Sequence, residues 1–234
     1  MIKAVLFDLD GTLLPMDQEE FTKVYLHLLS KKMEQHGYEP EQMVKAVWTG
    51  TGAMVKNDGS TTNEKVFWGA FDKFWGKNAS ADEPMFQAFY EKEFEDVQNA
   101  CGYNENARKM IDEVKSMGYR TILATNPIFP ALATEKRIRW AGLTPEDFEL
   151  YTTYENIGYC KPNPQYYQEI LNRTGLLPEE CVMIGNDVTE DMVAETLGMK
   201  VFLLTDCMIN KEEKDISVYP NGSFQEAIEY IKSL

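Results

Sequence analysis

The stretch VLFDLDGTLL, residues 5–14, places two acids directly after an apolar run and directly before Gly-Thr. The run that precedes Asp8 is short and rich in β-forming residues, as in a strand that is buried on both faces. Two unpaired carboxylates at the end of such a strand would be strongly unfavourable, because a buried charge needs a compensating partner. Asp8 and Asp10 therefore predict a positive charge close by, and with it a site at the end of this strand.

Short apolar runs alternate with helix-length segments over most of the chain. Strands are predicted at 3–8, 120–125, 181–185 and 200–204, with a weaker candidate at 148–152. Helices are predicted at 104–117, 131–140, 164–174 and 188–197, each followed by a glycine that can close it, and an amphipathic helix is expected after residues 220–223. This order favours right-handed crossovers, so the predicted fold class is α/β, with a Rossmann-like parallel sheet and helices on both faces.

Residues 15–101 interrupt the alternation, because a helical period replaces the strand-like runs. Aromatic and aliphatic residues lie at helical spacing in two stripes, Phe21 to Leu29 and Phe67 to Trp75. Helix starts are predicted by capping-box spacing at Asp17 with Glu20, Thr61 with Glu64, and Ser80 with Glu83. We interpret most of the aromatics as packing within this insert. The predicted domains are a core of residues 1–14 and 102–234 and a small all-helical cap of residues 15–101.

The charge balance restricts the partners of this chain. There are 38 acidic and 23 basic residues and a formal net charge of -15, so neither nucleic acid nor an anionic membrane is an expected partner. An acidic protein that handles anions must build a local positive site from a metal ion, a lysine or backbone N–H groups.

The cysteines and the apolar segments restrict the setting further. The four cysteines and two histidines lack zinc-site spacing, and no apolar segment has the length of a signal peptide or a membrane span. We expect free cysteines and a cytoplasmic location. The oligomeric state is left open by the sequence, and a monomer is compatible with it.

Polar residues gather where three predicted strands end. Thr125 and Asn126 follow the strand TILAT, and Asp187 follows VMIG, while Lys161 precedes a helix that begins near Pro164. In an open parallel sheet, ligands bind outside the carboxyl ends of the strands, so these groups are expected to converge with Asp8 and Asp10.

The chemistry of this set points to phosphate. Asp8, Asp187 and Asp191 carry hard oxygen ligands of the kind that Mg²⁺ accepts while it keeps waters and a substrate oxygen. A carboxylate can attack phosphorus and divide hydrolysis into two steps. Asp10 stands one residue further into the Gly-Thr turn and is the candidate proton donor, for which a raised pKa is needed.

Four segments in order resemble the motifs of the haloacid dehalogenase superfamily: DLDGT at 8–12, ATN at 124–126, CKPNP at 160–164 and GNDVTED at 185–191. The helical insert after the first motif resembles the small cap domain of that superfamily. One departure is Asn186, which stands between Gly185 and Asp187 where many members have Gly-Asp directly.

The resemblance implies a role for each matched residue. Asp8 would be the nucleophile and a Mg²⁺ ligand, and Asp10 the general acid and base, with its backbone carbonyl on the metal. Thr125, the Asn126 N–H and Lys161 would hold the phosphoryl group. Asp187 would be a direct metal ligand, and Asp191 a second ligand or an acceptor behind the first. The implied activity is that of a Mg²⁺-dependent phosphatase that acts on a small phosphorylated metabolite through an aspartyl-phosphate.

Other members of the scaffold compete with this interpretation. A phosphosugar mutase would keep every residue named above, and a non-catalytic ligand-binding relative would not need the paired nucleophile and acid. A dehalogenase or a phosphonoacetaldehyde hydrolase is disfavoured. The resemblance implies that these two branches of the superfamily lack the second aspartate of the first motif, which is present here as Asp10.

Substrate choice is expected to lie in the insert, because a cap that closes over the site contacts the leaving group. The stretch 48–65 is rich in Gly, Ser, Thr and Asn and is predicted to be a loop between cap helices. Lys56 in this stretch is a candidate contact for an anionic group of the substrate, although a solvated loop lysine is the competing interpretation.

Overall fold

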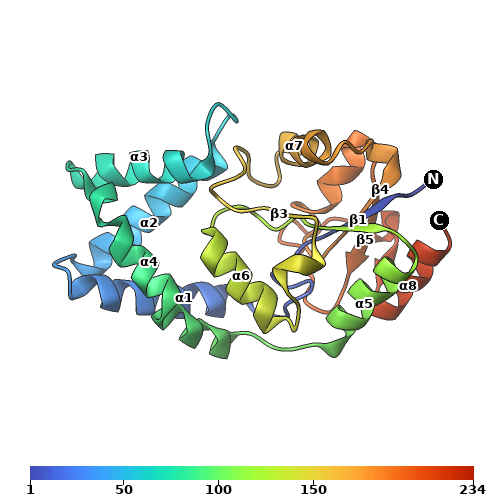
Figure 1. The fold of residues 1–234 in the computed structure, drawn as a ribbon, viewed down its shortest axis with the longest axis horizontal. Coiled ribbons are helices and arrows are strands. Elements are labelled where there is room, and N and C mark those ends of the chain that lie inside the picture. Colours follow the sequence, from blue (N-terminus) through green and yellow to red (C-terminus); the bar gives the residue numbers. More distant parts are fainter.

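The computed structural model describes residues 1–234 and contains one six-stranded parallel sheet in the order β3-β2-β1-β4-β5-β6 (Figure 1). The strands are β1 Ala4–Phe7, β2 Arg120–Leu123, β3 Leu150–Tyr151, β4 Cys181–Gly185, β5 Lys200–Leu204 and β6 Asn221–Gly222. The predicted α/β fold class is confirmed. The sixth strand was not predicted, because it has two residues and its Pro-Asn-Gly context is typical of a turn.

Strand β1 lies at the centre of the sheet, between β2 and β4. Its last residue, Phe7, is in register with Leu123 of β2 and Ile184 of β4. All four residues of β1 are fully buried, as expected for a strand that is covered on both faces. The segments that follow β1, β2 and β4 therefore leave the sheet at the same edge and at nearly the same level.

Helices cover both faces of the sheet. They are α5 Glu105–Ser116, α6 Ala131–Trp140, α7 Pro164–Thr174 and α8 Phe224–Lys232. Alternate residues of β1 belong to two apolar clusters: Val5 and Phe7 pack with residues of α5 and α8, while Ala4 and Leu6 pack with residues of α7. The segment predicted as a helix at 188–197 forms only the short 3-10 helix η5, Met192–Leu197, because residues 187–191 form a turn that serves the site described below.

Residues 15–101 contain no strand and gather at one end of the molecule (Figure 1). Their helices are α1 Gln18–Glu34, α2 Pro40–Val55, α3 Asn63–Trp75 and α4 Glu83–Glu91, with the 3-10 turns η1 Ala79–Asp82 and η2 Glu93–Ala100. The chain enters and leaves this unit at one place, where Met16 bridges Cys101 and the Gly102 N–H donates to the Pro15 carbonyl at 2.7 Å. We propose residues 15–101 as the cap.

The helix starts in the cap match the predictions in part. Asp17 caps α1 and accepts the N–H groups of Glu19 and Glu20. The N-cap residue of α3 is Thr62 rather than Thr61. Helix α4 begins at Glu83, and its N-cap residue is Asp82 rather than Ser80.

The prediction of a loop over 48–65 was wrong at both ends, because α2 continues to Val55 and α3 begins at Asn63, so the loop between these helices is confined to residues 56–62. Gly50 is helical and lies against the ring of Phe67 in α3, where a Cβ would come within 2.5 Å of that ring. The glycine therefore marks the close packing of two helices rather than a loop.

None of the helices combines the length and the apolar character that a membrane-spanning helix needs.

A buried carboxylate joins α5 to the turn before β3. Asp147 accepts hydrogen bonds from Arg108 at 2.6 Å, Lys115 at 2.7 Å and the Thr144 N–H at 2.8 Å. Burial would raise the pKa of Asp147, but the bonds from Arg108 and Lys115 outweigh it and hold that pKa well below its usual range. This contribution to stability is complete above the unfolded pKa of about 3.9 and is lost as the pH falls towards the lower folded value.

We predict that Asp147→Asn lowers the free energy of unfolding at pH 7 by about 1.5–3 kcal/mol, the range for hydrogen bonds to charged groups. Urea unfolding of both proteins from pH 7 to pH 3 measures this difference. It should shrink below about pH 4, where the unfolded chain takes up a proton at this position. A difference that is constant across this range would contradict the assigned ion pairs.

Candidate active site

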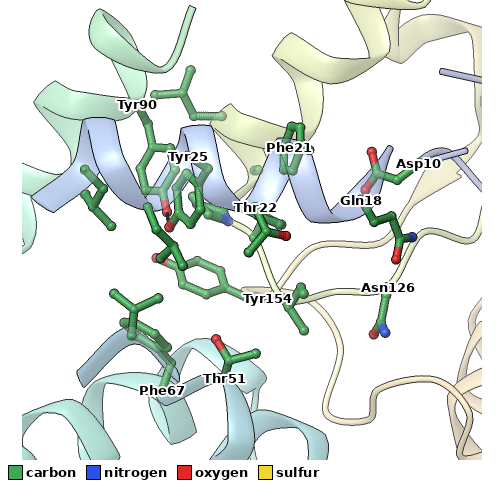
Figure 2. A pocket seen from close by; sticks show the side chains of 18 of the residues that line it. Asp10, Gln18, Phe21, Thr22, Tyr25, Thr51, Phe67, Tyr90, Asn126 and Tyr154 are labelled. Atoms are coloured by element: carbon green, nitrogen blue, oxygen red, sulfur yellow. Dashed lines mark hydrogen bonds between the residues drawn. The ribbon is translucent and has the colours of Figure 1, made fainter. Parts of the chain in front are cut away.

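A cavity of about 460 Å³ opens at the carboxyl ends of the central strands and extends into the helical insert. Asp8, Asp10, Asn126, Asp187 and Asp191 are among the residues that line its floor. Figure 2 shows Asp10 and Asn126 at one end of this space and aromatic side chains of the cap at the other. The structure therefore brings these five predicted residues together.

Lys161 supplies the positive charge that the two acids of the first strand require. Its Nζ lies 2.9 Å from Oδ1 of Asp8 and 2.6 Å from Oδ1 of Asp191, and its side chain is 1% exposed. Burial opposes the charged form of Lys161, but Asp191 and Asp8 together hold the pKa of its ammonium well above the usual range. These two carboxylates therefore favour the charged form of Lys161 beneath the cavity floor.

Asp191 orients its neighbours in the turn after β4. While its Oδ1 accepts from Lys161, its Oδ2 accepts the backbone N–H of Asp187 at 3.0 Å. A Cβ on Gly185 would come within 2.1 Å of that Oδ2, so glycine is required at this point. Both carboxylate oxygens of Asp191 are thus engaged, and the geometry favours a supporting role behind Asp8 and Asp187.

Asp10 pairs with a residue that the sequence analysis missed. The guanidinium of Arg137, in α6, donates to Oδ2 of Asp10 and lies 4.4 Å from the centre of the Phe129 ring. Arg137 is fully buried. The detectable signal is its position on the same helical stripe as Ala133, Thr134 and Ile138, all of which are buried.

The other oxygen of Asp10, Oδ1, is buried and has no hydrogen-bond partner. Burial raises the pKa of Asp10 above its ordinary value, while Arg137 opposes that rise. The pKa of this carboxyl group is therefore shifted upward, which is the direction that a proton donor needs.

Thr125 and Asn126 follow β2; Asn126 lines the cavity, whereas Thr125 is buried and is not among the lining residues. The Thr125 carbonyl accepts from the hydroxyls of Thr152 at 2.6 Å and Tyr166 at 2.8 Å, which fixes the backbone at this point. The Asn126 side chain donates to Glu190 at 3.0 Å, and its Oδ1 is buried without a partner.

Glu190 was also missed by the sequence analysis. It lines the cavity, and burial raises its pKa to about 8. The only signal in the sequence is its place between Asp187 and Asp191.

Asn186 ties the first motif to the fourth. Its side chain accepts from the Thr12 hydroxyl at 3.0 Å and donates to the Cys207 carbonyl at 2.7 Å. Gly11 has a φ of +87°, and a Cβ there would come within 2.3 Å of the Asn186 amide nitrogen. The extra residue before Asp187 therefore braces the turn that carries Asp8 and Asp10.

The carboxylates offer oxygen atoms to a cation but do not enclose one. No group of three or more His, Cys, Asp or Glu side chains is gathered closely enough to hold a metal by itself. Lys161 engages only one oxygen of Asp8, and Asp187 Oδ1 accepts the N–H groups of Thr189 and Glu190. Mg²⁺ commonly binds through one or two carboxylates, with waters and a substrate oxygen completing its shell. Asp8 and Asp187, beside the unpartnered Asp10 oxygen, fit that pattern.

The cap contributes the upper wall of the cavity. Phe21 and Tyr25 of α1, Phe67 of α3 and Tyr90 of α4 line it. These aromatics therefore face a ligand space in addition to packing within the cap. Lys56 does not reach this space: it is exposed at the end of α2 and is not among the lining residues.

Comparisons with known proteins agree with this geometry. The profile of the haloacid dehalogenase-like hydrolases matches residues 2–194. The glyceraldehyde 3-phosphate phosphatase of Methanothermobacter thermautotrophicus is 25% identical, with 100% of this chain and 98% of that protein covered. Pyrophosphatase PpaX of Bacillus velezensis is 24% identical, with 85% and 81% covered. The solved 2-haloacid dehalogenase of Pseudomonas syringae pv. Tomato DC3000 shares the fold, with a TM-score of 0.63, 18% identity, and 100% and 99% covered.

We predict that Arg137 and Asp10 are energetically coupled. Arg137→Met should lower the free energy of unfolding by about 3–5 kcal/mol, because it leaves a buried carboxylate unpaired. Asp10→Asn leaves a buried guanidinium unpaired, and the double variant should lose less than the sum of the two single variants. Urea unfolding of the four proteins at pH 7 measures the coupling. Additive losses would contradict the pair.

Proposed function

This chain belongs to the haloacid dehalogenase-like hydrolases, in their phosphatase branch, and we propose that it hydrolyses a small phosphorylated metabolite through an aspartyl-phosphate in a Mg²⁺-dependent reaction. The observation that carries the proposal is the buried ammonium of Lys161, shared between Asp8 and Asp191 at the floor of the cavity. The similarity to a glyceraldehyde 3-phosphate phosphatase and to a pyrophosphatase supports a phosphoryl substrate.

The first step of the proposed reaction is attack by Asp8 on phosphorus. A carboxylate oxygen of Asp8 forms a bond to phosphorus, while the bond between phosphorus and the leaving oxygen breaks. Asp10 gives its proton to that oxygen, and the alcohol departs. The burial that raises the pKa of Asp10 favours this donation.

The second step releases inorganic phosphate. Asp10, now ionised, accepts a proton from a water that attacks phosphorus, and the bond between phosphorus and Asp8 breaks. Both carboxyl groups then return to their starting states. Arg137 holds Asp10 in place through both steps by donating a hydrogen bond to its Oδ2, which a protonated and an ionised carboxyl group can both accept.

The charge of the transferred group is met by three kinds of donor. Lys161 would neutralise negative charge on Asp8 and on the phosphoryl oxygens, with the Thr125 hydroxyl and the Asn126 N–H as further donors. Mg²⁺ would be held by Asp8, Asp187 and the Asp10 carbonyl, and when bound it supplies electrostatic stabilisation of the phosphoryl oxygens. Asp191 would keep Lys161 and Asp187 in position.

We predict that the protein releases p-nitrophenol from p-nitrophenyl phosphate in the presence of Mg²⁺. EDTA should abolish this turnover, and added Mg²⁺ should restore it. Asp8→Asn should eliminate it, because an amide cannot form the acyl phosphate. Thermal unfolding of Asp8→Asn provides the control for folding. Undiminished turnover in this variant would refute the assigned nucleophile.

We predict a separate effect of Asp191→Asn on metal affinity. The amide loses the ionic contact to Lys161 and weakens the support of Asp187, so the Mg²⁺ concentration for half-maximal activity should rise about 10- to 100-fold. A Mg²⁺ titration of p-nitrophenyl phosphate turnover measures this shift. An unchanged midpoint would show that Asp191 does not support the metal ligands.

A further inference from the structure

We propose, on the basis of the phosphatase function above, that the substrate is the phosphate monoester of an uncharged and largely apolar alcohol. Its organic part would lie against the aromatic wall of the cap, in the part of the cavity that contains no cation. This part, here called the cap half, is lined by residues of α1–α4, by residues 128–132 and by Tyr154 and Glu155.

The cap half offers an extended apolar surface. Tyr25, Phe67 and Tyr154 are directed towards the same space in Figure 2, and Phe21, Trp68 and Phe86 add to the lining. The cavity is continuous with the floor at Asp8, and its volume of about 460 Å³ lies within the range, roughly 300–1,000 Å³, of pockets that enclose drug-sized ligands. A leaving group with a ring or a branched carbon chain would bury apolar surface there.

No basic side chain faces this space. The residues that line the cavity include no Lys, Arg or His, whereas the cap half includes Glu83 and Glu155. Burial raises the pKa of nearby Glu64, and repulsion from Glu155 and Glu83 adds to that rise. A second phosphate or a carboxylate on the leaving group would therefore enter a negative and partly desolvated region without a counter-charge.

Two buried cations near the cavity, Lys161 and Arg137, are already engaged by other groups. Lys161 is paired with Asp8 and Asp191, and its side chain is 1% exposed. Arg137 donates to Asp10, to the Thr134 hydroxyl at 3.2 Å and to the Ala133 carbonyl at 3.3 Å. Neither is available to an anionic group that lies in the cap half.

Apart from Glu83 and Glu155, the polar groups of the cap half are neutral. Gln18, Thr22, Thr51 and Gln87 line it and offer hydrogen bonds to a hydroxyl or an ether oxygen. The Tyr25 and Tyr90 hydroxyls bond to each other at 2.7 Å, and burial raises the pKa of Tyr25 to about 12. These groups fit an uncharged alcohol. They do not offer the positive charge that would bind the second phosphate of a bisphosphate, which a phosphosugar mutase must hold.

The test uses three esters of one shape: 4-methylbenzyl, 4-carboxybenzyl and 4-aminomethylbenzyl phosphate. All three release a benzylic alcohol, so differences in kcat/KM report mainly on the ring substituent. With Mg²⁺ present, phosphate release should give the highest kcat/KM for the methyl ester and a value about 100-fold lower for the carboxyl ester. A highest value for the carboxyl or the aminomethyl ester would overturn the proposal.

A charge variant tests the location. Thr51 lines the cavity from α2, so Thr51→Arg should raise the kcat/KM ratio of the carboxyl to the methyl ester by about 10-fold. Thr49→Arg adds the same charge on the exposed face of α2 and should leave the ratio unchanged. Equal ratios in the two variants would contradict the assigned binding region.

The outcomes separate the two proposals. If p-nitrophenyl phosphate is hydrolysed but none of the benzyl esters is, the inference about the leaving group fails and the phosphatase function stands. If no phosphate monoester is hydrolysed with Mg²⁺ present, the proposed function itself fails.

Discussion

The site depends on one buried ammonium. Lys161 joins the carboxylate that follows β1 to the carboxylate in the turn after β4, and it arrives from the loop before α7. Because an ammonium and its two partners are removed from water, loss of any member would leave an uncompensated charge in the interior. The same contact fixes Asp8 beneath the cavity and, through Asp191, the backbone of Asp187.

Each aspartate of the first motif has its own buried cation. Arg137 holds Asp10 from the side of α6, while Lys161 holds Asp8 from the side of α7. Both positive charges are thus directed inward, at the reacting end, and the wall that the cap provides contains none. This separation explains how a protein with a net charge of -15 attracts one phosphoryl group while its cap half disfavours a second anion.

The alternation of strands and helices, the glycines that follow the helices and the convergence of Asp8, Asp10, Lys161 and Asp187 could be predicted, because strand ends meet at one edge of a parallel sheet. Arg137 was missed: its place on the helical stripe of α6 indicates that it faces inward, but its pairing with Asp10 depends on how the folded chain brings α6 to the turn after β1. The C-terminal end of α2 was not predicted for a similar reason. Gly50 is needed for the contact of α2 with α3, and a single sequence does not reveal that contact.

The central claim is that the Lys161 contact presents Asp8 as the group that accepts the phosphoryl. The most direct measurement is acid quenching during turnover, followed by borohydride reduction and peptide mass spectrometry. An aspartyl-phosphate is reduced to homoserine, so the account predicts this change at Asp8 alone, and only when substrate and Mg²⁺ are present. Phosphate release without any such change at Asp8, or with the change at another aspartate, would contradict it.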